Sequence, residues 1–100
     1  MSGNDAKVLL NLNFPDFQSD LFDLDASEVK KILKTLKKVR GLTWNEVFRD
    51  HGLNWEEVKS MPGNYTVRLS QSYRAVVTRE GRWMQFSALH QDHDGAYGEK

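Results

Sequence analysis

The sequence predicts an α+β domain that spans residues 1–100, with an N-terminal strand, two or three helices, and an antiparallel three-stranded meander packed against those helices. Apolar residues recur at helical spacing within residues 25–41. Within residues 64–89 they instead alternate with polar residues, as in strands that bury one face. A chain of 100 residues is typical of one domain and is long enough for one hydrophobic core.

The first expected strand covers residues 7–14, where apolar side chains alternate loosely until Pro15 ends the run. A strand that stops at a proline is typical of a sheet edge. The stretch from Asp16 to Leu24 has apolar residues at mixed spacing. We therefore expect irregular structure or a single helical turn there.

The clearest helix follows Asp25, which can cap its N-terminus, and Glu28 three residues later completes a capping-box pattern. Gly41 is expected to end this helix. Its apolar face is formed by Val29, Ile32, Leu33, Leu36 and Val39.

A second helix is expected from Thr43, with a glutamate three residues later, to Gly52. A further helical turn is expected from Asn54 to Lys59, because Asn54 and Glu57 repeat the cap pattern.

The meander is expected to consist of residues 64–69, 73–78 and 82–89, with Glu80 and Gly81 as a two-residue turn. This turn places Arg79 opposite Arg82 and Arg74 opposite Ser87. The face toward the helices would then hold Tyr73, Ala75, Val77, Met84, Phe86 and Ala88. The other face would hold Arg68, Arg74, Val76, Thr78, Trp83, Gln85 and Ser87, beside the chain's last segment, residues 90–97.

Composition narrows the function classes. The chain has no cysteine, which excludes disulfides, thiolate catalysis and cysteine zinc sites. It has no apolar run as long as the roughly 20 residues of a membrane helix and no signal-peptide pattern. We therefore expect a cytoplasmic protein that does not contact a membrane.

The net charge is zero, but the charges are segregated along the chain. Residues 8–29 carry acids and no base, whereas residues 30–40 carry six bases and no acid. The basic stretch can be an ordinary solvated helix face or a surface that faces phosphates. Its candidate RNA-binding residues are Lys30, Lys34, Lys37 and Lys38.

The order of elements and the segment 65–78 resemble the RelE/ParE toxin superfamily. In that family a basic residue on one strand, here Arg68, precedes a Tyr-Arg pair on the next, here Tyr73 and Arg74. A hairpin and a polar segment that ends in a tyrosine, here Tyr97, complete the pattern. The stretches around Trp44 and residues 52–55 resemble a chromosomally encoded RelE-like branch of cytotoxic translational repressors.

The resemblance implies the toxin of a bacterial type II toxin–antitoxin system, an endoribonuclease (mRNA interferase) that cleaves mRNA on the ribosome without metal or cofactor. Its partners would be a cognate antitoxin, the ribosome and mRNA. Such chemistry needs cations for the charge on the reacting phosphate, and we expect Arg68 and Arg74 to supply them. His90 or His93 would serve as acid or base, and Tyr97 would stack on a base or assist proton transfer.

Trp83 and Gln85 lie on the same expected face as Arg74 and are further candidates for binding RNA. Two histidines three residues apart, His90 and His93, also match metal ligands in kind. No third histidine is near them in the sequence, and we expect no metal.

Two other functions stay open at this point. A pI near 6.8 is low for an enzyme that works inside ribosomal RNA, and favours a non-catalytic RelE-like binding module. A gyrase-directed inhibitor, the other branch of the superfamily, would not need the histidine-rich end of the chain.

Overall fold

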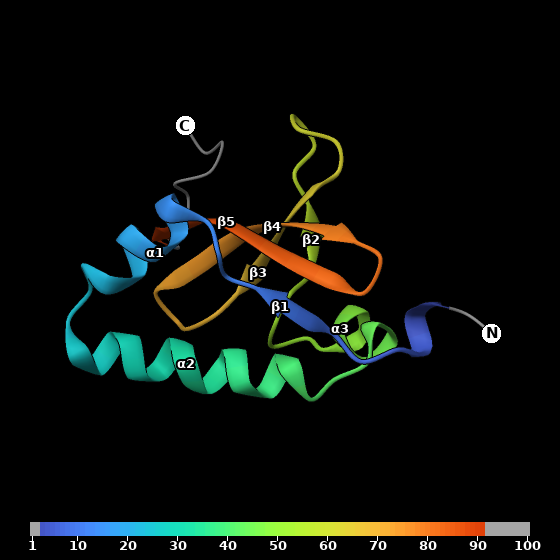
Figure 1. Cartoon of the computed structure of the whole chain (residues 1–100), viewed down its shortest axis with the longest axis horizontal. Coiled ribbons are helices and arrows are strands. Elements are labelled where there is room, and N and C mark those ends of the chain that lie inside the picture. Colours follow the sequence, from blue (N-terminus) through green and yellow to red (C-terminus); the bar gives the residue numbers. More distant parts are fainter. Residues whose placement is uncertain (1–2, 92–100) are drawn as a thin grey trace.

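A computed structural model of the chain describes residues 3–91, and it has the expected α+β class (Figure 1). Its elements are the 3-10 helix η1 (Gly3–Asp5), strand β1 (Leu9–Asn11), helices α1 (Pro15–Phe22), α2 (Ala26–Arg40) and α3 (Trp44–Arg49), and strands β2 (Glu56–Glu57), β3 (Asn64–Arg68), β4 (Tyr73–Glu80) and β5 (Trp83–Gln91). Within these residues no helix is long and apolar enough to cross a lipid bilayer.

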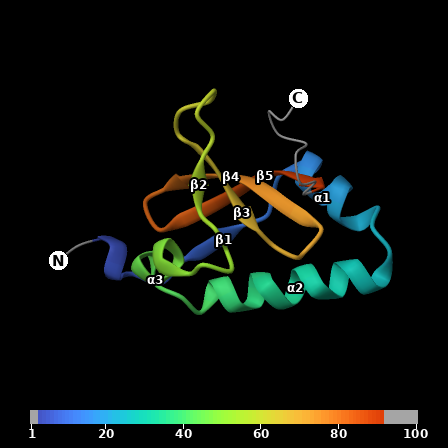
Figure 2. The ribbon, with the colours of Figure 1, turned by 180° about the vertical axis from the view of Figure 1, so that it is seen from behind.

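The strands form one five-stranded sheet in the order β1-β5-β4-β3-β2 (Figure 2). The expected meander is its centre, since β3, β4 and β5 pair antiparallel. β1 pairs parallel with β5 and forms an edge, as Pro15 indicated. The other edge is β2, a strand of two residues that the sequence did not predict.

Both helices expected after Asp25 and Thr43 form, but Glu28 does not complete a capping box with Asp25 and instead accepts a hydrogen bond from Ser70 Oγ at 2.6 Å. The Asp25 carboxylate accepts a hydrogen bond from the backbone N–H of Glu28 at the start of α2, and Gly41 follows its end. Thr43 and Glu46 form a complete capping box at the start of α3. α3 ends at Arg49, three residues before the expected Gly52.

Residues 15–22 form a helix of two turns, where we expected irregular structure or one turn. Pro15 occupies the first turn, where its missing N–H costs no hydrogen bond. Phe17 and Leu21, four residues apart, are both buried, and the Phe17 ring lies 5.4 Å from that of Phe86 on β5. Packing against β5 therefore stabilises this short helix.

The helical turn expected from Asn54 to Lys59 is wrong. Glu56 and Glu57 pair with Thr66 and Tyr65 on β3, and Asn54 has a positive φ of 49°. The ring of Trp55 stacks on that of Tyr65 with centroids 4.6 Å apart. Strand pairing and ring stacking, both long-range, outweigh the local cap pattern.

The hairpin register also differs from the prediction. The turn residues are Gly81 and Arg82, so Glu80 lies opposite Trp83, and Arg79 faces Met84 instead of Arg82. Gly81 has φ 61°, as the first position of a type II′ turn requires. This register is two residues from the expected one, and a shift of two leaves side chains on their predicted faces.

A β-bulge near the end of β5 moves the side chains that follow it to the opposite face of the sheet from the one predicted. The register shifts between Val76 and Val77, which lie opposite Ala88 and Phe86, so that Ser87 is the extra residue. Beyond this bulge Leu89 is buried, and Ala88, expected inward, lies on the opposite face. Arg74 consequently faces His90 and not Ser87.

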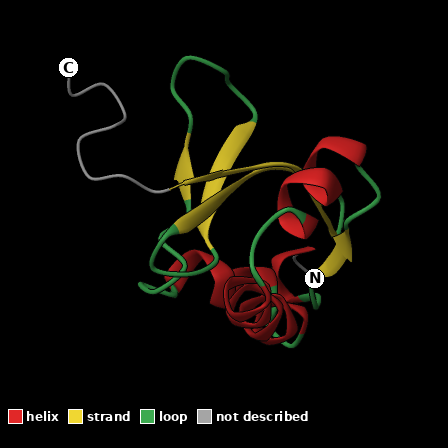
Figure 3. Cartoon of the chain, turned by 90° about the vertical axis from the view of Figure 1, so that its left-hand side faces the viewer, coloured by secondary structure: helices red, strands yellow, loops and turns green. Residues whose placement is uncertain are grey.

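The core lies between the sheet and the helices; α2 runs along the sheet in Figure 1 and is seen end-on in Figure 3. It contains Val8, Phe17, Leu21, Ile32, Leu36, Val39, Trp44, Val47, Leu53, Val67, Leu69, Ala75, Val77, Met84, Phe86 and Leu89. Leu33, expected on the apolar face of α2, is 49% exposed. The face of the sheet away from this core carries the polar side chains considered next; we call it the open face.

Candidate functional site

The register brings Arg68, Arg74 and His90 into one row across three neighbouring strands. Arg68 on β3 lies directly opposite Arg74 on β4, and Arg74 lies directly opposite His90 on β5. Directly opposed residues on adjacent strands project from the same face of a sheet. The open face therefore carries the two guanidinium groups and the imidazole side by side, in the order Arg68, Arg74, His90. His90 belongs to this row because of the bulge at Ser87.

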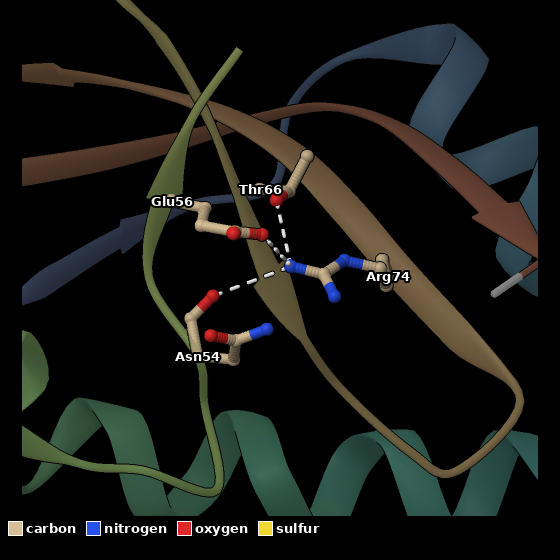
Figure 4. Close-up of polar contacts among 4 residues, drawn as sticks. All are labelled: Asn54, Glu56, Thr66 and Arg74. Atoms are coloured by element: carbon tan, nitrogen blue, oxygen red, sulfur yellow. Dashed lines mark hydrogen bonds and ion pairs between the residues drawn. The ribbon is translucent and has the colours of Figure 1, made fainter. Parts of the chain in front are cut away.

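Arg74 is the buried member, with 7% of its surface exposed. Its Nη2 donates to Thr66 Oγ1 at 2.8 Å and to the backbone oxygen of Asn54 at 3.3 Å, and it lies 3.4 Å from Glu56 Oε1 (Figure 4). These contacts all converge on one end of the guanidinium and hold it in place.

The other end of the guanidinium consists of Nε and Nη1. Nε and Nη1 of Arg74 make no hydrogen bond to residues 3–91. Among residues 3–91, Arg74 is thus a fixed cation whose Nε and Nη1 have no partner, and such N–H groups suit a phosphate oxygen.

Sequence reasoning missed Glu56, the carboxylate beside Arg74. Its side chain is 65% exposed, and it lies opposite Thr66, on the open face. Glu57, the next residue, projects from the other face, because strand side chains alternate. The two glutamates can be assigned to different faces only if residues 56–57 are known to form a strand. The sequence predicted a helical turn there, and Glu56 was therefore missed.

Arg68 and His90 are both exposed. Arg68 lines a hollow of about 210 Å³ together with Lys38, Leu53 and Ser70. Arg74 lines a second hollow of about 220 Å³ with Glu56 and Thr66. The two arginines share a face and a row, but their side chains open onto different hollows.

The structure separates most of the lysine candidates from this row. Lys30, Lys34 and Lys37 are exposed on α2, which packs on the opposite face of the sheet. Lys38 is the exception, because it lines the hollow of Arg68 and pairs with Asp50 at 2.8 Å.

Trp83 and Gln85 do share the open face with Arg74, since they lie opposite Glu80 and Thr78 on β4. Trp83 is 45% exposed. Gln85 accepts a hydrogen bond from Thr78 Oγ1 and donates one to Glu80 Oε1. Both residues lie toward the hairpin end of the sheet, away from the row.

His93 and Tyr97 lie outside the described residues. Within residues 3–91 no three histidine, aspartate or glutamate side chains gather as metal ligands would.

Among residues 3–91 three carboxyl groups have a lowered pKa, and each caps or directly follows a helix. Hydrogen bonds from the backbone N–H groups of Glu28 and Thr43 lower the pKa of Asp25 and Glu46, respectively. A hydrogen bond from Lys38 and another from the backbone N–H of Leu53 lower the pKa of Asp50. These shifts mark helix caps and an ion pair that stabilise the fold.

Comparison with known proteins shows that the fold of this chain is similar to a solved structure. No protein-family model matches the chain, and no curated protein matches it. Among solved structures, the YoeB dimer from Staphylococcus aureus is similar, with a TM-score of 0.55 and 18% sequence identity. The match covers 88% of this chain and 99% of that one, which supports a RelE-like fold.

Proposed function

We propose that this chain is the toxin of a bacterial type II toxin–antitoxin system and cleaves mRNA on the ribosome, without metal. The observation that carries the proposal is the Glu56–Arg74 pair next to His90 on the open face. The likeness to YoeB, itself a toxin of such a system, supports it.

The reaction is attack of a ribose 2′-hydroxyl on the adjacent phosphate, with loss of the 5′-oxygen of the next nucleotide. The attacking hydroxyl must lose a proton, and a carboxylate within reach of the phosphate can accept it. We assign this role to Glu56, because its partner Arg74 would hold the same phosphate through Nε and Nη1.

Charge builds on the phosphate oxygens as the 2′-oxygen attacks. A guanidinium that is already fixed stabilises this charge without reorganisation, and the contacts of Arg74 to Thr66 and Asn54 fix it. Arg68, opposite Arg74, provides a second cation for the neighbouring phosphate.

The leaving 5′-oxygen needs a proton, and an imidazole supplies one near neutral pH. Glu56 on β2 and His90 on β5 lie on opposite sides of β4, which carries Arg74, so the base and the acid flank the cation. His93 remains a second candidate for this proton transfer, and Tyr97 for stacking on a base.

The proposal implies three partners and a location. A cognate antitoxin would restrain the toxin, the ribosome would present the mRNA, and all of them are cytoplasmic. A non-catalytic binding module of the same fold is the second candidate, and the zero net charge favours it.

Induced expression in a bacterial host tests the proposal, with growth and mRNA cleavage sites followed by primer extension. Wild type should arrest growth and cut mRNA within translated frames, and Arg74→Ala should do neither. Arg40→Ala removes an exposed arginine from the end of α2 and should arrest growth like wild type. Harmless wild type, expressed and folded by circular dichroism, would favour the non-catalytic module.

A further inference from the structure

A groove of about 630 Å³ lies at the β1 side of the open face, away from the Arg74 row. Its walls come from β5 and β4, from β1 and the residues that follow it, and from α1. Trp83 is 45% exposed. Within residues 3–91 its indole makes no hydrogen bond and no contact with another ring. The groove therefore contains a large aromatic side chain that the described fold leaves partly exposed.

The rest of the lining is rich in side-chain amides. Asn11 Oδ1 accepts from the backbone N–H of Asn13, and Gln18 Nε2 donates to the Leu12 oxygen. The amide nitrogen of Asn11 and the amide oxygen of Gln18 are left without a partner in residues 3–91. The groove thus offers both donors and acceptors beside an aromatic ring.

Glu80 is the charged residue of the groove. Its Oε1 accepts from Gln85 Nε2 at 3.1 Å, and Gln85 is itself held by Thr78 at 2.9 Å. This chain of hydrogen bonds fixes the carboxylate beside Trp83, which lies opposite Glu80 in the register. A fixed carboxylate favours a ligand that presents N–H groups.

The groove and the Arg74 row lie on the same face of the sheet, and β4 runs from one to the other. Thr78, whose partner Gln85 lines the groove, is four residues from Arg74 on β4. Four residues of a strand span roughly 13 Å. A stacked nucleic-acid strand advances about 3.4 Å per nucleotide, so this separation corresponds to about four nucleotides, and to fewer in an extended strand.

We propose that this groove binds one unpaired base of the RNA, stacked on Trp83 and hydrogen-bonded to the amides and to Glu80, while the scissile phosphate lies at Arg74. Recognition of single-stranded RNA combines an aromatic side chain with polar groups that read a base edge, and the groove has both. The inference rests on the proposed function, since it takes RNA as the substrate.

The chemistry of the groove also predicts selectivity. Adenine, cytosine and guanine carry an exocyclic amino group that can donate to the Glu80 carboxylate, whereas uracil presents carbonyl oxygens on either side of its one N–H. The groove therefore selects a base with an amino group over uracil.

Binding of labelled 2′-O-methyl hexanucleotides tests the inference by fluorescence anisotropy at one fixed salt concentration. These RNAs have no free 2′-hydroxyl to attack, so binding is measured apart from cleavage. Wild type should bind the A and C hexamers more tightly than the U hexamer. Trp83→Ala should weaken binding of the A hexamer about 5- to 150-fold, as for loss of one base–aromatic stack.

Three further variants complete the design. Trp83→Phe should retain most of the affinity, because it keeps a ring. Glu80→Gln should bind the U hexamer nearly as well as the A hexamer. Phe22→Ala, which removes a 70% exposed ring from α1, is the matched control and should bind like wild type.

Equal affinity of wild type and Trp83→Ala for the A hexamer would overturn the inference. A protein partner would then be the alternative ligand of the groove. So would a wild type that binds none of the hexamers. Failure of the proposed function is seen separately, as harmless expression of the wild-type chain. Weakened binding by Trp83→Ala in that case would place a base site on a non-catalytic module.

Discussion

Thr66 Oγ1 lies 2.8 Å from Arg74 Nη2, and this is the shortest of the contacts that hold the buried guanidinium. The two residues come from neighbouring strands and are diagonal to each other on the open face, since Thr66 lies opposite Val76 and Arg74 opposite Arg68. The hydroxyl positions the arginine without occupying the N–H groups that would meet a phosphate.

Thr66→Val should keep the fold and lower the rate of RNA cleavage about tenfold, because it keeps the side-chain shape and removes the acceptor. Thr66→Ser, which retains a hydroxyl, should cleave at close to the wild-type rate. Rates are measured in a translation extract by primer extension. Equal rates for the valine variant and wild type would show that Asn54 and Glu56 suffice to hold Arg74.

Glu56→Gln should lower cleavage about 100-fold or more, because an amide cannot accept the proton of the 2′-hydroxyl. Glu57→Gln is its matched control, since this exposed glutamate lies on the same strand and projects from the other face. The same cleavage assay compares them. A similar loss in both variants would point to a general effect of charge and would remove Glu56 from the proposed mechanism.

Asn54→Val should destabilise the protein by about 1–3 kcal/mol, because a β-branched residue at a φ of 49° is strained. Asn54→Gly should be as stable as wild type, since glycine adopts this conformation readily. Urea unfolding measures both. Because the Asn54 backbone oxygen accepts from Arg74, the valine variant should also be the less active of the two.

Asp50 should contribute to stability at neutral pH and lose that contribution in acid. Its pKa is lowered in the folded state, chiefly by the hydrogen bond from Lys38, so the folded state favours the ionised form. A lowered pKa gives stability that is complete above the unfolded value of about 3.9 and disappears as the pH falls through the folded value.

Asp50→Asn should therefore cost about 0.2–1 kcal/mol at pH 6, and this difference from wild type should shrink at pH 3. Urea unfolding at the two pH values measures it. Asp20→Asn, an exposed change on α1, should keep the wild-type pH dependence. A difference that is the same at both pH values would mean that the Lys38 pair adds no stability.

Thr43→Ala should cost about 0.5–2 kcal/mol, because it removes the side chain that caps α3 and breaks the capping box with Glu46. Thr35→Ala changes the same residue type in the interior of α2, where alanine is the better helix former, and should be neutral or slightly stabilising. Thermal unfolding of both variants gives the comparison.

The sequence predicted the parts of the fold whose signals are local. The Asp25 cap, the apolar period that follows it and Gly41 all indicate α2, and the structure confirms the helix, in which Ile32, Leu36 and Val39 of that period are buried and Leu33 is exposed. The strands of the meander were predicted by alternation, which a two-residue error in register does not disturb.

What the sequence missed depends on contacts between distant residues. β2 is too short to show a period, and it exists because Glu56 and Glu57 pair with β3 while Trp55 stacks on Tyr65. Without β2, Glu56 could not be placed beside Arg74. The bulge at Ser87 likewise has no local signal, and it moves His90 opposite Arg74 and Ala88 away from the core.

The parallel pairing of β1 with β5 links the start of the sheet to its last described strand. Leu9–Asn11 finds its partners only at Trp83–Gln85, so the sheet cannot close while β5 is still being synthesised. His90 joins Arg74 in the same late step. We expect a nascent chain that stops before residue 83 to have no assembled site, so that an incomplete chain would lack the proposed activity.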